Sequence, residues 1–245
     1  MEKIFNLKAK EYLSTESGKK TFNIEHFTES APRYDIATIG LSLGQDKKWK
    51  NFLLDKINLE LDQNSRCLDL ACGTGDIVFK LAKKFPKSQI IGVDITEAML
   101  AIARNKNSSD KIMFFNQDIA NLKFANNSLD LITGSYALRN SPNIKKTLED
   151  VYVLLKEKGV CIFLDFAKPS NQVMQKIQYY LLKIWGSMWG LILHKNSEVH
   201  GYISESLKDY PSSKSLKILA SNIGFKSVQS YKLFFGMIEI LRLEK

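Results

Sequence analysis

The stretch LDLACGTGD at Leu68–Asp76 decides the fold of this chain. Its apolar start is typical of a buried strand, and the segment Ile77–Phe85 that follows has helical apolar spacing. The glycines of the turn, Gly73 and Gly75, can adopt backbone angles that other residues avoid, and they let a ligand approach the main chain closely. Free amides at the start of the next helix can hold a carboxylate. The stretch therefore predicts a strand, a ligand-binding turn and a helix.

Strands and helices alternate on both sides of this turn. We expect strands at Arg66–Ala71, Gln89–Asp94, Ile112–Asn116, Leu129–Gly134, Val160–Phe166, Lys226–Leu233 and Met237–Leu243, and helices at Lys47–Ile57, Ile77–Phe85, Glu97–Asn105, Ile144–Lys156 and Ser213–Ile223. This alternation predicts an α/β fold with a doubly wound, mainly parallel, seven-stranded Rossmann-like sheet that closes in an antiparallel hairpin. Thr96 is placed to cap the third of these helices, and Gly224 to end the last one.

The chain divides into a short leading segment and one large domain. Residues 1–33 form a polar, partly helical segment in which residues 1–25 are expected as loop and short helix. Residues 34–245 form the α/β domain, and about 170–210 form a helical, aromatic-rich insert within it. A length of 245 residues with 44% hydrophobic residues suits one such domain with an ordinary core.

The residues around the turn favour one cofactor. Asp94 ends the second strand, where a carboxylate can accept two hydrogen bonds from a ribose diol. The dinucleotide pattern requires a glycine where this chain has Val78, and no Walker lysine follows the turn. The acidic residues Asp69 and Asp76 would repel a phosphate but suit the ammonium and sulfonium groups of S-adenosylmethionine. We therefore expect S-adenosylmethionine rather than NAD, and S-adenosylhomocysteine as the product.

A second acidic position supports this expectation. Asp118 and Ile119 follow the third expected strand, so they lie at the same edge of a parallel sheet as the glycine turn. The carboxylate of Asp118 can accept from an adenine amino group, and the next backbone amide can donate to the adenine ring. An aspartate in a loop is often merely solvated, but together with the turn and Asp94 it indicates a nucleoside site.

Charge and cysteine content constrain the setting. The formal net charge of +9 either draws the protein towards nucleic acid, anionic lipid or an anionic substrate, or reflects a lysine-rich composition, since the lysines are scattered. Cys67, Cys72 and Cys161 form no CxxC pair and lie in or beside apolar runs, so we expect a reducing compartment and neither disulfides nor a metal site. The longest apolar run, Ile184–Leu193, is half of the roughly 20 residues that a spanning helix needs, and no signal peptide is recognisable. We expect a cytoplasmic protein.

The sequence resembles the class I methyltransferases and, more closely, the ubiquinone/menaquinone biosynthesis C-methyltransferase family. The resemblance runs from about Tyr34 to the C-terminus. It rests on Tyr34-Asp35, SLGQDKKWK at Ser42–Lys50, the glycine turn, SYALRN at Ser135–Asn140, LDFAKP at Leu164–Pro169 and YISESLKDYP at Tyr202–Pro211. It implies methylation of a ring carbon of a polyprenylated benzoquinol or naphthoquinol such as demethylmenaquinol. It also implies that Thr74, Asp94, Asp118, Ile119 and Ser135 contact the cofactor, and that Arg139 and Asn140 lie near the acceptor.

The candidate site residues fall into three groups. The cofactor group is Asp69, Cys72, Gly73, Thr74, Gly75, Asp94, Ile95, Met99, Asp118, Ile119 and Ser135. The acceptor group is Tyr34, Tyr136, Asn140 and Tyr202, and the reaction group is Arg139, Asp165 and His200. Three departures from the family pattern accompany them: Asp46-Lys47 replaces a His-Arg pair, Lys156–Gly159 (KEKG) replaces a Lys-Pro-Gly-Gly turn, and Cys72 stands where glycine is common.

The chemistry requires help for a weak nucleophile. A ring carbon attacks only when the adjacent phenolic hydroxyl, whose pKa is near 10, loses its proton. Arg139 remains protonated, so we expect it to stabilise the phenolate. Asp165 and His200 are the candidate bases, although a strand-end carboxylate and a loop histidine can equally be structural. Tyr202 either orients the acceptor or is a structural residue that packs in the core.

The insert at Val173–Leu193 has two interpretations. It caps the sheet, or it forms a lipid-facing lid through which a prenyl tail enters, with Trp185 and Trp189 at the interface. Nearby lysines, Lys176, Lys183 and Lys195, favour an anionic membrane surface.

Other functions remain open on the sequence. An RNA methyltransferase fits the charge, but the chain has no basic stripe with interleaved aromatics and no RNA-binding module, so we expect no nucleic-acid partner. A methyltransferase acting on another phenolic or secondary-metabolite acceptor shares every cofactor residue. A binding module without transfer activity is disfavoured by Arg139. The sequence also leaves a homodimer open.

Overall fold

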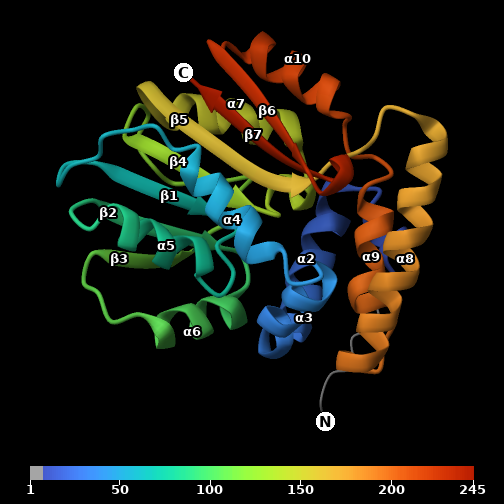
Figure 1. Cartoon of the computed structure of the whole chain (residues 1–245). Coiled ribbons are helices and arrows are strands. Elements are labelled where there is room, and N and C mark those ends of the chain that lie inside the picture. The colour runs from blue at the N-terminus through green and yellow to red at the C-terminus, as the bar shows by residue number, and fades with distance from the viewer. Residues whose placement is uncertain (1–7) are drawn as a thin grey trace.

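Seven strands form one twisted sheet in the order β3-β2-β1-β4-β5-β7-β6 (Figure 1). The structure is a computed structural model and describes residues 8–245. The strands are β1 (Arg66–Leu70), β2 (Gln89–Asp94), β3 (Ile112–Asn116), β4 (Leu129–Ser135), β5 (Leu155–Phe166), β6 (Ser227–Leu233) and β7 (Ile238–Glu244). β7 runs antiparallel between β5 and β6, while β1 to β5 pair in parallel. The predicted fold class and its closing hairpin are confirmed.

Helices cover both faces of the sheet. α4 (Asp46–Asp55), α5 (Asp76–Lys84) and α6 (Glu97–Lys106) contribute to the core on one face. α7 (Ile144–Leu154) and α10 (Ser213–Ile223) pack on the other. Each face is covered because the central strands are buried along almost their whole length, as strands flanked by helices on two sides must be.

A layer of further helices lies beyond the carboxyl ends of the strands. It contains α1 (Ala9–Tyr12), α2 (Glu16–Ser30), α3 (Tyr34–Leu41), α8 (Gln172–His194) and α9 (Glu198–Ser206). Figure 1 shows α8 and α9 side by side, with α2 and α3 next to them. Gly186 and Gly190 allow α8 to approach the backbone around α9 closely, since a Cβ at either position would lie 2.5 Å from a carbonyl oxygen. Within residues 8–245, no helix is both long and apolar enough to cross a bilayer.

The remaining short elements are 3-10 turns. They are η1 (Ala31–Arg33) before α3, η2 (Leu138–Asn140) after β4 and η3 (Phe234–Gly236) between β6 and β7. η2 carries Arg139, so a single turn of helix places that side chain at the end of the sheet.

Three sequence expectations were wrong in detail. Residues 1–25 were expected as loop and short helix; residues 1–7 lie outside the described part and α1 is such a short helix, but from Glu16 the chain forms the 15-residue helix α2, because Phe22 and His26 are buried against α9. α7 ends at Leu154 and β5 begins at Leu155, since Leu155 pairs with Leu129 and Lys156 binds Asp130. Thr96 occupies the N-cap position of α6, but its hydroxyl makes no capping hydrogen bond.

Candidate active site

The glycine turn joins β1 to α5 with left-handed backbone angles. Gly73 and Gly75 have φ of +54° and +89°. A Cβ at Gly75 would lie 2.7 Å from the ring of Phe79, so Gly75 is needed for the packing of α5 and supports the turn rather than lining it. A Cβ at Gly73 would meet nothing within 4 Å, so the backbone there faces open space. Gly73 is therefore where a ligand can reach the main chain.

Asp94 connects the end of β2 to this turn. Its Oδ2 accepts a hydrogen bond of 2.9 Å from the Gly73 amide, and its Oδ1 accepts one of 2.8 Å from the Thr96 amide. The side chain is buried, and this burial raises the pKa of Asp94. A carboxylate has further acceptor positions beyond these two, so Asp94 can still receive a diol.

A cavity beside Asp94 gathers most of the predicted cofactor residues. Its lining includes Gly73, Asp94, Ile95, Met99, Asp118, Ile119 and Ser135. The Ser135 hydroxyl is buried and makes no hydrogen bond, so it is available to a ligand. Asp118 accepts from the Ala120 amide at 2.9 Å and forms an ion pair of 2.9 Å with Lys20 on α2, which also lines the cavity.

A second cavity continues along the other side of the turn. It includes the predicted residues Asp69, Cys72, Gly73 and Thr74. Asp69 accepts a 2.7 Å hydrogen bond from Thr133, and burial raises the pKa of Asp69 to about 7. The hydroxyl of Thr74 donates at 2.7 Å to Asp35, so Thr74 holds α3 over the turn in this structure.

A third, largely apolar cavity lies between α2, α3, α4, α9 and the ends of β5 and β7. It is lined by His26, Phe27, Tyr34, Ala37, Thr38, Leu41, Ser42, Trp49, Tyr136, Arg139, Asn140, Phe166, Leu182, His200, Tyr202, Ile203, Phe234, Met237 and Ile238. Tyr34 and Tyr136 line all three cavities. The two nucleoside-side cavities and the apolar one therefore meet at this pair of tyrosines, which belong to the predicted acceptor group.

Arg139 is the charged group of the apolar cavity. Its side chain is buried, its Nη1 donates to Ser206 Oγ at 2.6 Å and its Nη2 to Tyr202 Oη at 3.4 Å. Its guanidinium carbon lies 5.5 Å and 5.2 Å from the ring centroids of Phe166 and Tyr202. These contacts hold a cation at a fixed place in an apolar wall.

Asp165 partners this arginine and does not line the apolar cavity. Its Oδ2 accepts from the Arg139 amide and its Oδ1 from the Phe166 amide, both at 2.8 Å, and Arg139 Nε lies 3.4 Å from Oδ1. Burial raises the pKa of Asp165, while the guanidinium of Arg139 opposes that rise. Asp165, one of the two candidate bases, contacts Arg139 and lies outside the lining of the apolar cavity, and this arrangement favours the structural alternative for this residue.

His200 does line the apolar cavity. Its Nε2 is buried without a hydrogen-bond partner, and burial lowers the pKa of His200 to about 4. The imidazole is therefore neutral at pH 7. Asn140, from the acceptor group, borders both this cavity and the Asp94 cavity, and it donates at 2.9 Å to the Tyr136 carbonyl.

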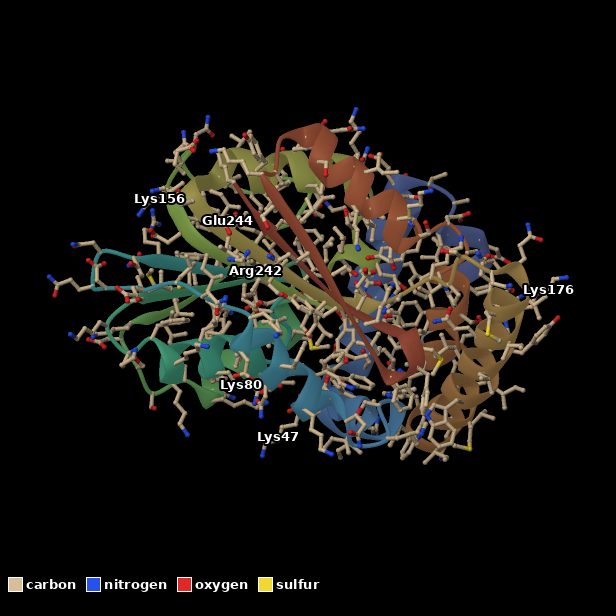
Figure 2. The ribbon with its side chains drawn as sticks, turned by 45° about the horizontal axis from the view of Figure 1, so that its top comes forward. Lys47, Lys80, Lys156, Lys176, Arg242 and Glu244 are labelled. Carbon is tan, nitrogen blue, oxygen red and sulfur yellow. The ribbon has the colours of Figure 1, made fainter. Side chains whose placement is uncertain are left out.

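Sequence reasoning missed several residues of this site. Asp46 and Lys50 of α4 lie in the second cavity, where Lys50 bridges Asp46 and Asp76 at 2.7 Å and 2.9 Å. The Asp46-Lys47 departure from the family pattern pointed to this cavity, since both residues line it, Asp46 with a buried side chain and Lys47 with an exposed one at the edge of the molecule (Figure 2). Nothing in the sequence indicated that Lys20 and His26 belong to the site, because α2 is polar and lies far from the glycine turn in the sequence.

The residues present fit S-adenosylmethionine. An open backbone position at Gly73, a buried carboxylate at Asp94 and an unpartnered hydroxyl at Ser135 provide donors and acceptors on one continuous lining. The acidic side chains Asp69 and Asp76 border the second cavity, where an ammonium group would be favoured. The same cavity is also lined by lysines, of which Lys50, Lys80 and Lys106 are paired with Asp46, Asp76 and Asp35.

Solved structures share this fold. A SAM-dependent methyltransferase from Thermotoga maritima, described as a possible histamine N-methyltransferase, superimposes with a TM-score of 0.63 at 17% identity over 91% of this chain and 99% of its own. Phosphoethanolamine N-methyltransferase 2 of Haemonchus contortus, solved with S-adenosylhomocysteine, gives a TM-score of 0.62 at 14% identity over 82% of this chain and 53% of its own. The fold is that of the class I methyltransferases.

The chain belongs to the ubiE/COQ5 methyltransferase family, whose model matches residues 15–243. The demethylmenaquinone methyltransferase of Bacteroides fragilis is 31% identical over 233 residues, which are 93% of this chain and 94% of the relative. The ubiquinone/menaquinone biosynthesis C-methyltransferase UbiE of Geotalea daltonii is 30% identical over 237 residues, which are 94% and 98% of the two chains. The protein is therefore an enzyme, a methyltransferase, and the resemblance found in its sequence is confirmed.

Proposed function

We propose that the protein transfers a methyl group from S-adenosylmethionine to a ring carbon of a polyprenylated quinol, of the demethylmenaquinol or benzoquinol type. The observation that carries this proposal is the meeting of a nucleoside-type groove and an apolar cavity at Tyr34 and Tyr136. The names of the relatives, which describe demethylmenaquinone and ubiquinone/menaquinone methylation, support the same acceptor class.

The cofactor residues have distinct tasks in this proposal. When bound, S-adenosylmethionine supplies an electrophilic methyl group on a sulfonium. Asp94 accepts the ribose hydroxyls, and Asp118 with the Ile119 amide holds the adenine edge. Ile95 and Met99 pack against the base. On the other side of the turn, Asp69 and the backbone near Gly73 and Thr74 hold the methionine portion, with Ser135 between the two halves.

The acceptor is oriented and activated by the apolar cavity. Arg139 stabilises the phenolate by charge, because a buried cation favours the ionised hydroxyl. His200 accepts the hydroxyl proton. Tyr202 and Asn140 position the ring. Asp165 fixes Arg139 through the contacts given above and acts as a positioning residue. Holding the ring carbon and the methyl donor in line supplies the rest of the rate enhancement.

A membrane surface is the place from which a prenylated acceptor would arrive. The outer face of α8 and α3 exposes large apolar side chains, namely Ile36, Ile39, Leu43, Val173, Met174, Ile177, Tyr180, Leu181, Ile184, Met188, Leu191 and Ile192. We name this set the α3–α8 apolar face. Gly40 of α3 packs on Trp189 of α8, so the two helices are in direct contact. Lys176 extends outwards from α8 (Figure 2) and can meet anionic headgroups. We infer peripheral contact between this face and an anionic membrane.

A second acceptor class is a smaller phenol. This acceptor class is favoured by Asp46, which replaces part of the family's His-Arg pair and accepts a hydrogen bond from Tyr136 at the edge of the apolar cavity. The test is incubation with methyl-labelled S-adenosylmethionine and either reduced demethylmenaquinone or a panel of soluble phenols, followed by mass spectrometry. Label on the quinone ring carbon supports the proposal. Label on a soluble phenol, or on oxygen, with none on the quinone would overturn it.

A further inference from the structure

The three histidines of the chain gather beside the apolar cavity. His26 lies on α2, His194 ends α8 and His200 lies on α9. The ring centroids of His194 and His200 are 5.2 Å apart in an edge-to-face arrangement, and those of His26 and His200 are 6.3 Å apart. These elements are distant in sequence, but α8 and α9 run side by side (Figure 1). A cluster of titratable rings therefore adjoins the reaction space.

The cluster leads from the cavity to the surface. His200 lines the cavity, and its Nε2 is buried without a hydrogen-bond partner. The His194 side chain is 0% exposed, and its Nδ1 lies 3.6 Å from Glu29 Oε1, whereas the Glu29 side chain is 34% exposed. Exposure therefore rises from His200 and His194 to Glu29. Of His200, His194 and Glu29, only His200 belongs to the cavity lining as the structure describes it.

Ring methylation releases one proton for every methyl group transferred. The hydroxyl first loses its proton to give the phenolate, the ring carbon then forms a bond to the methyl group, and the carbon–sulfur bond breaks with its electron pair passing to sulfur. The ring recovers its aromatic state when the ring carbon loses its proton and the oxygen regains one, so that one proton is released overall. In a buried site this proton needs a route to water. We propose that His200, His194 and Glu29 form that route, in which His200 accepts the proton, His194 passes it on and Glu29 releases it. The inference rests on the proposed function.

The electrostatics of the cluster favour movement outwards. Burial lowers the pKa of His200 to about 4, with a further lowering from His194, so a proton does not stay on His200. Burial also lowers the pKa of His194, but the Glu29 carboxylate opposes this and Arg33 adds to it. On the inner side, His26 belongs to the cluster, and Arg139 disfavours a positive charge on His26 beside the cavity. The Glu29 carboxylate thus attracts a proton at the outer end of the cluster.

The test compares four single variants of the full-length enzyme, one of them a control. Single-turnover methyl transfer is measured between pH 5.5 and 9 in H2O and D2O, with affinities for both substrates determined separately. We expect His194→Gln and Glu29→Gln to slow transfer roughly tenfold or more, to raise the solvent isotope effect and to leave both affinities within about twofold. Added imidazole should restore the rate of His194→Ala. The control Glu198→Gln removes a carboxylate from α9 but leaves the His194–Glu29 pair intact, and it should behave as wild type.

The outcomes separate the two proposals. Wild-type rates, pH profiles and isotope effects in both His194→Gln and Glu29→Gln would overturn the proton route while leaving the proposed function standing. Absence of methyl transfer to any quinol by the wild-type enzyme would overturn both. Because Glu29 is partly exposed, Glu29→Gln remains informative even if His194 variants do not fold, which thermal melting will reveal.

Discussion

Tyr136 Oη donates a 2.8 Å hydrogen bond to Asp46 Oδ1, which joins the residue after β4 to the first residue of α4. Tyr136 lines all three cavities, and Asp46 is also held by Lys50 at 2.7 Å. The same tyrosine has a left-handed φ of +58°, which a bulky residue adopts at a cost of about 1–2 kcal/mol. The contact therefore fixes α4 against the point where methyl donor and acceptor would meet.

Removing this hydroxyl should destabilise the protein. Tyr136→Phe leaves the buried Asp46 carboxylate with one partner fewer, so we expect a loss of about 1–3 kcal/mol in the free energy of unfolding, measured with urea. Asp46→Asn should cost a similar amount, and the double variant less than the sum. Tyr231→Phe, which removes an exposed hydroxyl bonded to Gln229, is the matched control. Additive losses from Tyr136→Phe and Asp46→Asn would show that the pair is not coupled.

Replacing Arg139 with lysine should reduce turnover strongly. Lysine keeps the charge but cannot reach Ser206, Tyr202 and Asp165 together, because it lacks the planar fork of guanidinium donors. We expect kcat to fall about 100-fold, in the range found for lost transition-state donors, while affinity for S-adenosylmethionine stays unchanged. Arg66→Lys, at a partly buried arginine bound to Gln89, is the control. A near-normal kcat in Arg139→Lys would contradict the proposed role of Arg139 in stabilising the phenolate.

The stability should depend on pH through His200. The folded protein holds the pKa of His200 at about 4, below its ordinary value of 6.5. Between these values the unfolded chain binds more protons than the folded one, so His200 makes the protein less stable as the pH falls from 6.5 to 4. The contribution amounts to about 3 kcal/mol. Because Asp69, with a pKa of about 7, acts in the opposite direction, the measured quantity is the difference between wild type and His200→Gln. A difference that does not change with pH would contradict this.

The α3–α8 apolar face should bind anionic vesicles. Ile184 and Ile192 are 70% and 61% exposed on α8, and glutamate at either position should weaken co-sedimentation with anionic liposomes at low salt by tenfold or more. Ile218→Glu on α10, where the isoleucine is 51% exposed on another part of the molecule, should have no effect. If wild type does not bind vesicles but the Ile184→Glu variant dissociates a dimer in sedimentation velocity, the face is instead a contact between two copies.

The regular part of the fold was predictable because local pattern and tertiary environment agree there. The ranges Gln89–Asp94, Ile112–Asn116 and Ser213–Ile223 match the structure residue for residue. The start of β5 was not predictable, because Leu155 leaves the helix to satisfy a ladder with Leu129 that only the folded sheet provides. The length of helix α2 was not predictable for a similar reason. Its few buried residues stabilise the helix only by packing on α9, which is distant in sequence.

The cofactor side of the site followed from the sequence more fully than the acceptor side. Gly73 and Asp94 belong to strand ends, whose position relative to one another is set by the parallel sheet. The apolar cavity instead draws on α2, α3, α4 and α9, whose packing no local pattern specifies. Asp165 was one of two candidate bases because it ends a strand, whereas its contacts with the amides of Arg139 and Phe166 depend on the folded site and gave no pattern in the sequence. The histidine cluster requires three distant elements to meet.

The most direct test of the account is isothermal titration calorimetry of the pure protein with S-adenosylhomocysteine and S-adenosylmethionine. The account predicts one site per chain, with binding weakened at least tenfold by Asp94→Ala, because the ribose hydroxyls lose their acceptor, and unchanged by the exposed control Asp110→Ala. No heat of binding with either nucleoside, or equal affinity in Asp94→Ala and wild type, would contradict it.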